Sequence, residues 1–134
     1  MRAQIDESGV LFTAQRSFSL WKYGVGHSQL LIRSVPSGSQ EFCMDIKFEG
    51  VAAVKLAAKY NGVAIRLVPE EESARLCEYA GVPPKWRSEL VAISLGLHRG
   101  SDQVLCQSVS VLYGGSDPIV VDPRDQEVLW QYEG

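Results

Sequence analysis

The chain has 134 residues and a mass of 14.8 kDa, the size of one ordinary domain, and either half of it would be too small to bury an adequate core. Its composition, 46% hydrophobic and 22% charged, is that of a globular protein and excludes a disordered chain. The formal net charge of -3 gives no electrostatic reason to bind nucleic acid or an anionic membrane surface, and we expect neither as a partner.

We expect one domain over residues 1–134, with residues 1–12 as a candidate flexible N-terminal segment. The first eight residues are polar and acidic and do not read as a secretion leader, and no apolar run reaches the roughly 18 residues of a membrane helix. The three cysteines, Cys43, Cys77 and Cys106, are far apart and odd in number, and they read as free thiols. These features predict a cytoplasmic protein, because thiols stay reduced there.

The first half of the chain predicts a three-stranded meander. Residues 18–23 are aromatic and predict a short strand, and the glycines of residues 24–26 predict a turn. Residues 27–35 and 41–49 predict a hairpin, joined by turn-forming residues at 36–40. The second strand alternates strictly, with Phe42, Met44, Ile46 and Phe48 expected on the core and Glu41, Asp45, Lys47 and Glu49 expected in water.

Residues 51–60 fit two periodicities. As a strand, this segment would turn at Asn61-Gly62, a favoured hairpin dipeptide, into a further strand at 63–68. As a helix, it would present an apolar stripe and would end at Gly62. We favour the strand, because the preceding segment and the Asn-Gly signal both predict a continuing sheet.

The second half predicts one helix and several strands. Pro69 followed by three glutamates is typical of a helix start, and Gly81 marks its end. Two prolines predict an extended or looped segment at 82–86. Further strands are expected at 90–97, 103–113, 119–121 and 128–132. Turn signals every 8 to 12 residues or so predict the fold class: mainly β, a single-domain antiparallel β-sandwich or partly closed β-barrel of about seven to nine strands with one short α-helix.

The two histidines do not form a metal-binding pattern. His27 and His98 are far apart and neither belongs to an H-x-x-x-H motif, so we predict neither a metal nor a cofactor. His27 precedes Ser28 and is a conceivable general base, but the nucleophile motif G-x-S-x-G is absent. A histidine at the surface or bonded to the backbone is the commoner situation, and we assign no catalytic residue.

One face of the hairpin groups polar side chains. His27, Gln29 and Arg33 are separated by even numbers of positions and therefore share a face of the first strand. If Asp45 and Lys47 of the second strand lie beside them, the five residues form a charged patch able to bind an anionic or polar ligand. The favoured alternative is ion pairing on a solvated face, in which each pair contributes less than about 1 kcal/mol.

Two tryptophans are candidate contact residues. Trp21 lies in the aromatic segment, and Trp86 lies between helix and strand, where a large ring is less easily buried. The neighbouring Lys85 and Arg87 make too short a basic run to indicate nucleic-acid binding.

The first half of the chain also carries a distinctive string of residues. It reads Phe18-x-Leu20-Trp21-x-Tyr23-x-Val25-x-His27-Ser28-Gln29-Leu30-Leu31-Ile32-Arg33-Ser34, followed by Asp45-Ile46-x-Phe48-x-x-Val51 and Gly62-Val63-Ala64-Ile65. This string resembles a family of small bacterial proteins of uncharacterised function. The resemblance implies a bacterial, cytosolic origin, and it implies no activity, ligand or catalytic residue.

The sparse acid, base and nucleophile sets favour a non-enzymatic interaction or binding module, one that self-associates or docks a protein partner through aromatic surface and edge strands. The alternative is a cofactor-free enzyme or small polar-ligand binder, with His27, Arg33 and Asp45, together with Cys43, inside a β cup.

Overall fold

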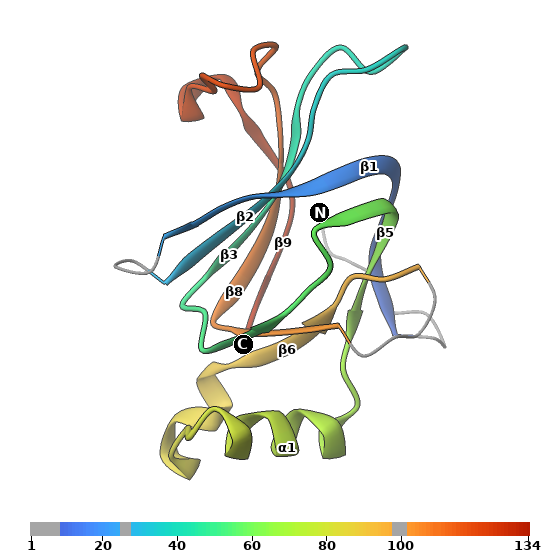
Figure 1. Ribbon diagram of the computed structural model, residues 1–134. Helices are drawn as coiled ribbons and strands as arrows, with labels where there is room; N and C mark the ends of the chain where they lie inside the picture. The colour runs from blue at the N-terminus through green and yellow to red at the C-terminus, as the bar shows by residue number, and fades with distance from the viewer. Residues whose placement is uncertain (1–8, 25–27, 98–101) are drawn as a thin grey trace.

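The computed structural model describes residues 9–24, 28–97 and 102–134, and these residues form a mainly β domain (Figure 1). Nine strands in the described part of the chain make one antiparallel sheet in the order β4-β7-β6-β5-β1-β2-β3-β8-β9. The predicted fold class is confirmed. The elements are β1 (Val10–Gly24), β2 (Gln29–Ser34), β3 (Met44–Glu49), β4 (Ala53–Lys55), β5 (Lys59–Leu67), α1 (Glu70–Tyr79), the 3-10 helix η2 (Pro84–Glu89), β6 (Val91–Ser94), β7 (Gln103–Cys106), β8 (Ser108–Tyr113), the 3-10 helix η3 (Pro123–Asp125) and β9 (Glu127–Glu133).

The long strand β1 joins the two halves of the sheet. Its pairing with β5 runs from Val10 to Ser19 and its pairing with β2 runs from Ser19 to Gly24, and the register with β5 shifts between Ala14 and Ser17. Such irregularities bend and twist a strand. The bend of β1 therefore folds one half of the sheet back over the other, as the ribbon shows (Figure 1).

A second bend lies where β3 leads to β4 and β7 leads to β8. The two chain segments stay bonded through it: the Gln107 amide donates to the Glu49 carbonyl at 2.9 Å, and the Ala52 amide donates to the Leu105 carbonyl at 2.7 Å. Gly50 has a φ of 64°, which other residues rarely adopt. The paired ribbon β3·β8 thus continues as β4·β7 in the other half of the sheet, which curls into a barrel that is not closed.

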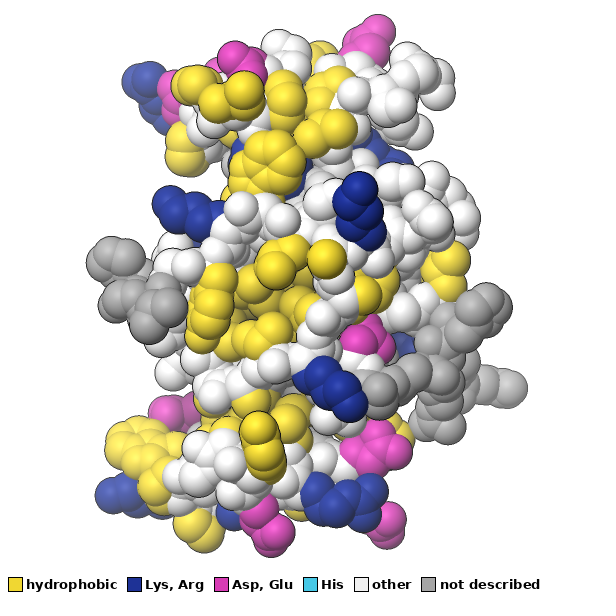
Figure 2. Space-filling model, in the orientation of Figure 1, with side chains coloured by type: hydrophobic (Ala, Val, Ile, Leu, Met, Phe, Trp, Pro, Cys, Tyr) yellow, Lys and Arg dark blue, Asp and Glu magenta, His cyan; other side chains and the backbone are white. Residues whose placement is uncertain are grey.

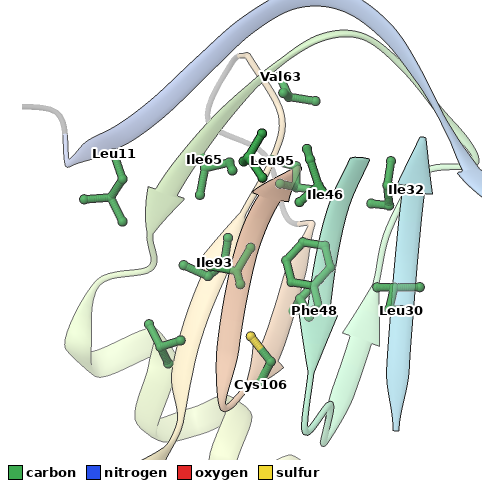
Figure 3. Packing of buried hydrophobic residues seen from close by; sticks show 14 of the residues in the cluster. Leu11, Leu30, Ile32, Ile46, Phe48, Val63, Ile65, Ile93, Leu95 and Cys106 are labelled. Atoms are coloured by element: carbon green, nitrogen blue, oxygen red, sulfur yellow. The ribbon is translucent and has the colours of Figure 1, made fainter. Parts of the chain in front are cut away.

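The core fills the space between the two halves (Figure 3). Fully buried side chains come from both halves, and each contributes roughly 1.5–3 kcal/mol by its removal from water. The largest of them are Phe18, Phe48, Leu30, Ile32, Ile46, Ile65, Ile93 and Leu95. The predicted core positions of Ile46 and Phe48 are therefore correct.

Two residues of the alternating segment depart from the prediction. Phe42 is 39% exposed, because it precedes β3 and lies outside the paired strand. Its ring contacts the ring of Tyr113 edge-on, with 5.7 Å between the centroids. Asp45, expected in water, is 1% exposed. The connection between β8 and β9 covers this face and buries the carboxylate.

The predicted helix is present as α1 and packs on the outer face of β6 and β7. A small second cluster lies beneath it, made of Cys77, Ala92 and Leu105. The acidic first turn, with Glu70, Glu71 and Glu72, suits the positive end of the helix dipole.

Several boundaries differ from the prediction. Asn61-Gly62 is not a hairpin turn but lies inside β5, opposite the register shift of β1, and the segment 51–60 contributes the short β4 and the start of β5. The φ of 97° at Gly62 accommodates the register shift between β1 and β5 and does not form a turn. The segment 103–113 is two strands, 119–121 is not a strand, and 84–89 is a 3-10 helix.

The candidate flexible segment predicted over residues 1–12 extends too far, because β1 begins at Val10. Residues 10–12 belong to β1, and Leu11 is buried in the core. Residues 1–8 lie outside the described part of the chain.

Candidate ligand-binding site

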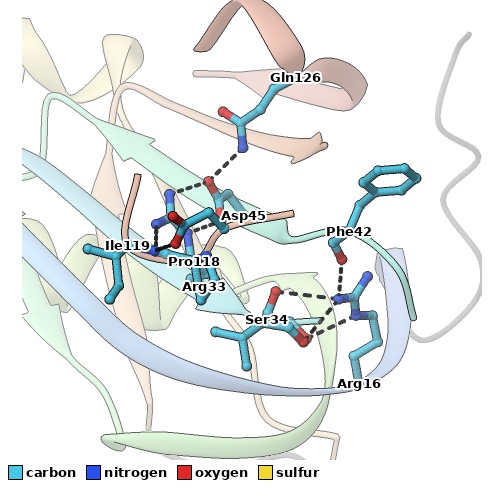
Figure 4. Close-up of polar contacts among 10 residues, drawn as sticks. Arg16, Arg33, Ser34, Phe42, Asp45, Pro118, Ile119 and Gln126 are labelled. Atoms are coloured by element: carbon cyan, nitrogen blue, oxygen red, sulfur yellow. Dashed lines mark hydrogen bonds and ion pairs between the residues drawn. The ribbon is translucent and has the colours of Figure 1, made fainter. Parts of the chain in front are cut away.

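A buried ion pair occupies the outer face of β2 and β3. Arg33 and Asp45 are direct cross-strand partners, and the guanidinium binds the carboxylate at two points, Nε to Oδ1 at 2.7 Å and Nη2 to Oδ2 at 2.9 Å (Figure 4). Such a bidentate arrangement is the strongest geometry for this pair. The hydrogen bond to Asp45 raises the pKa of Arg33.

The ion pair is buried because the connection between β8 and β9 folds over it. Arg33 Nη1 donates to the Pro118 carbonyl at 2.7 Å, and Gln126 Nε2 donates to Asp45 Oδ2 at 2.8 Å, so this connection is bonded to the ion pair at two points along its length (Figure 4). The prediction that this face is solvated is therefore wrong for Arg33 and Asp45. The β8–β9 connection, which is distant from both residues in the sequence, covers them.

A bulge in β1 brings two further side chains to this face. The register shifts between Leu20 and Lys22, so the residue between them is unpaired. Trp21 lies against the guanidinium of Arg33, with 5.2 Å from Cζ to the ring centroid, a cation–π distance. Lys22 lines a cavity next to the ion pair.

This cavity, which we call the outer cavity, measures about 340 Å³. Its sheet side is formed by β1, β2, β3 and β8, and its other side by the β8–β9 connection. A volume of this size suits a small molecule. The lining residues are Lys22, Gly24, Gln29, Leu30, Leu31, Arg33, Asp45, Lys47, Leu112, Val121, Pro123 and Gln126.

The groups that line the outer cavity differ in their freedom to bind. The side chains of Arg33 and Asp45 already form hydrogen bonds with each other and with the β8–β9 connection. Lys47 makes only a loose ion pair with Glu49, at 3.6 Å and partly exposed. Lys22 makes no ion pair in the described part of the chain. The described lining therefore offers two available ammonium groups beside apolar side chains, and no free carboxylate.

The structure brings four of the seven candidate binding residues to this cavity, namely Gln29, Arg33, Asp45 and Lys47, and places Trp21 beside it. Trp86 lies elsewhere, on η2, half-exposed and with Lys85 Nζ at 5.4 Å from its ring centroid. His27 and His98 lie outside the described residues.

The three cysteines are free, as predicted, and all three are buried. Cys43 does not open into the outer cavity. Burial raises the pKa of its thiol, and the pKa of Cys106 rises to about 12 for the same reason.

Sequence reasoning missed a buried arginine near this site. Arg16 of β1 donates from Nε to Ser34 Oγ at 2.9 Å and from Nη2 to the Phe42 carbonyl at 2.7 Å (Figure 4). Its Nη1 atom is buried and has no hydrogen-bond partner among the described residues, and burial lowers the pKa of the side chain. Arg16 fastens the turn between β2 and β3 to β1. In the sequence it looks like any surface arginine between polar neighbours, so no signal marks it.

No group of three His, Cys, Asp or Glu side chains among the described residues lies close enough to hold a metal ion. The helices in the same ranges include none that is long and apolar enough to cross a membrane. No protein-family model matches the chain, and no significant similarity to a curated protein or to a solved structure was found. The resemblance of the first half to a bacterial family stays an expectation.

Proposed function

We propose that the protein is a non-enzymatic binding module and that the outer cavity is its ligand site. The observation that carries this proposal is the convergence of Gln29, Lys22 and Lys47 on one cavity whose remaining charged residues neutralise each other. A reducing compartment such as the cytoplasm suits its three free thiols.

The hydrogen bonds of the ion pair favour binding over catalysis. A general acid or base needs a titratable group within reach of the substrate and free to exchange a proton. The Asp45 carboxylate already accepts bonds from Arg33 and Gln126, and Arg33 carries a raised pKa. These two residues are best understood as the support that shapes the cavity, which argues against the enzymatic alternative built on them.

The chemistry of the lining points to a small anion with an apolar body. Two ammonium groups attract a carboxylate or a similar head group, and a hydrogen bond to an ionised acceptor is roughly twice as strong as a neutral one. Leu31, Leu112 and Val121 offer apolar surface to the rest of the ligand. Gln29 adds an amide that both donates and accepts.

Calorimetry and NMR titration with hexanoate and benzoate test this proposal, with hexanamide as the uncharged comparison. We expect saturable binding of the carboxylates, about tenfold weaker binding of the amide, and a loss of about tenfold in Lys22→Gln and Lys47→Gln. Lys59→Gln removes an exposed lysine of β5 outside the cavity and serves as the matched control. Absence of saturation, or equal binding by the amide and by the variants, contradicts the proposal.

Docking of a second copy of this chain is the second candidate function. β9 ends the sheet order, and its Val128 is 58% exposed, as expected of a strand edge that pairs with another chain. Ile119 and Val120, close to the outer cavity along the same connection, are more exposed still. Sedimentation equilibrium is expected to show a dimer that Val128→Lys weakens. A monomer at every concentration refutes it.

A further inference from the structure

A second groove lies on the other half of the sheet, between β4 and α1. It measures about 700 Å³ and is lined by Ala53, Val54, Lys55, Glu72, Arg75, Leu76, Tyr79 and Gln103. We call it the β4–α1 groove. In Figure 2 the surface around α1, at the bottom of the view, shows apolar, basic and acidic side chains next to one another.

One wall of this groove is the edge of a sheet. β4 is the first strand in the sheet order and pairs only with β7 among the described strands. A strand at such an edge presents backbone groups to which an extended segment can bond. β4 has three residues, so an added strand gains few backbone bonds, and side chains must supply the rest of the binding energy.

The two walls together offer an apolar contact, with Val54 on β4 and Tyr79 on α1. Tyr79 is 86% exposed and Val54 is 40% exposed, and both line the groove. Large apolar side chains left in solvent beside a groove mark a contact surface. Alternate residues of an extended peptide would place one side chain against this apolar pair and the next away from it.

The charges of the groove select the partner. Lys55 and Arg75 are exposed and line it, and neither forms an ion pair in the described part of the chain. Glu72 is the single acidic residue among the described residues of the lining. The groove is therefore net positive within a protein of net charge -3, and it complements an acidic segment.

We propose that the β4–α1 groove binds an acidic, extended peptide segment of a protein partner, which adds as a strand to β4 and places its carboxylates near Lys55 and Arg75. The proposal does not depend on the outer cavity, which lies on other strands.

Selection of displayed linear peptides on the immobilised protein, followed by fluorescence polarisation with the synthetic peptides, tests this proposal. Selected peptides are expected to alternate acidic and apolar residues. Lys55→Glu and Arg75→Glu should each weaken binding about tenfold, whereas Lys59→Glu, an equal change of charge outside the groove, should not. Tyr79→Ala weakens the apolar contact without changing charge.

Two further readouts distinguish a strand from other binding modes. Methylation of alternate backbone amides of the peptide should abolish binding in one set of positions and leave it intact in the other. Amide NMR signals of Ala53, Val54 and Lys55 should shift on binding, while Lys47→Gln should leave the affinity unchanged. No selected peptide, helical peptides, or equal affinity for Lys55→Glu and Arg75→Glu overturns the proposal.

Discussion

The ion pair between Arg33 and Asp45 predicts that removing either partner alone is worse than removing both. Arg33→Met leaves the Asp45 carboxylate, 1% exposed, with the Gln126 side-chain amide as its remaining side-chain donor among the described residues. Asp45→Leu leaves a buried guanidinium with the Pro118 carbonyl. An uncompensated buried charge costs about 3–5 kcal/mol, so each single variant should lose that much free energy of unfolding.

The double variant Arg33→Met/Asp45→Leu removes both charges and fills the space with apolar atoms. Replacing a buried ion pair in this way is often close to neutral, so the double variant should lie within about 2 kcal/mol of the wild type. The coupling free energy of the cycle should then exceed about 3 kcal/mol, far outside the deviation of independent sites.

Urea unfolding followed by tryptophan fluorescence measures all four proteins. Lys47→Met breaks the exposed pair with Glu49 and is the control, expected to change the free energy of unfolding by less than about 1 kcal/mol. If the costs of the two single variants add up in the double variant, the two charges do not depend on each other and the reasoning is wrong.

Three further predictions concern buried groups. Arg16→Met should lose about 3 kcal/mol of the free energy of unfolding, measured in urea, because it leaves the Ser34 hydroxyl and the Phe42 carbonyl without their donor; a loss below about 1 kcal/mol contradicts the role of Arg16 as a fastener. The Cys106 thiol, whose pKa is raised to about 12, should react with a disulfide reagent only as fast as the protein opens, so the rate should rise with urea; fast reaction of the native protein speaks against its burial. Burial raises the pKa of Tyr60 from 10.0 to about 12, so the unfolded chain loses this proton first and stability should fall as the pH rises from about 10 to about 12; in Tyr60→Phe this part of the fall should disappear, and an unchanged pH profile refutes the assignment.

The hairpin of β2 and β3 was predictable because its signal is local. The alternation of Ile46 and Phe48 with polar residues requires one buried face, whatever the rest of the chain does. The helix α1 was predictable for the same reason, since its start and end are both marked by neighbouring residues.

The errors arise where one local signal serves two structures. An Asn-Gly pair supplies a backbone with positive φ, and this suits a hairpin turn as well as a strand irregularity. Gly62 takes the second role because β1 bends opposite it, and only the partner strand reveals that bend.

Four members of the candidate site were predictable from the sequence, but their environment was not. The spacing of Gln29 and Arg33 and of Asp45 and Lys47 placed all four on one outer face. Their burial depends on Pro118 and Gln126, which are distant in sequence and carry no periodic signal. Lys22 joins them through a bulge that shifts its side chain to the other face, a change that a period of two cannot express.

The bent ribbon that joins β3·β8 to β4·β7 has a consequence for folding. Its two sides lie about sixty residues apart in the chain, and contacts between such distant segments form slowly, because the intervening loop loses entropy before they are made. During synthesis, Met44–Lys55 leaves the ribosome well before its partner at Gln103–Tyr113 exists. Until then the nascent protein carries a bare strand edge, and its yield in a cell should depend on how well chaperones shield that edge from neighbouring chains.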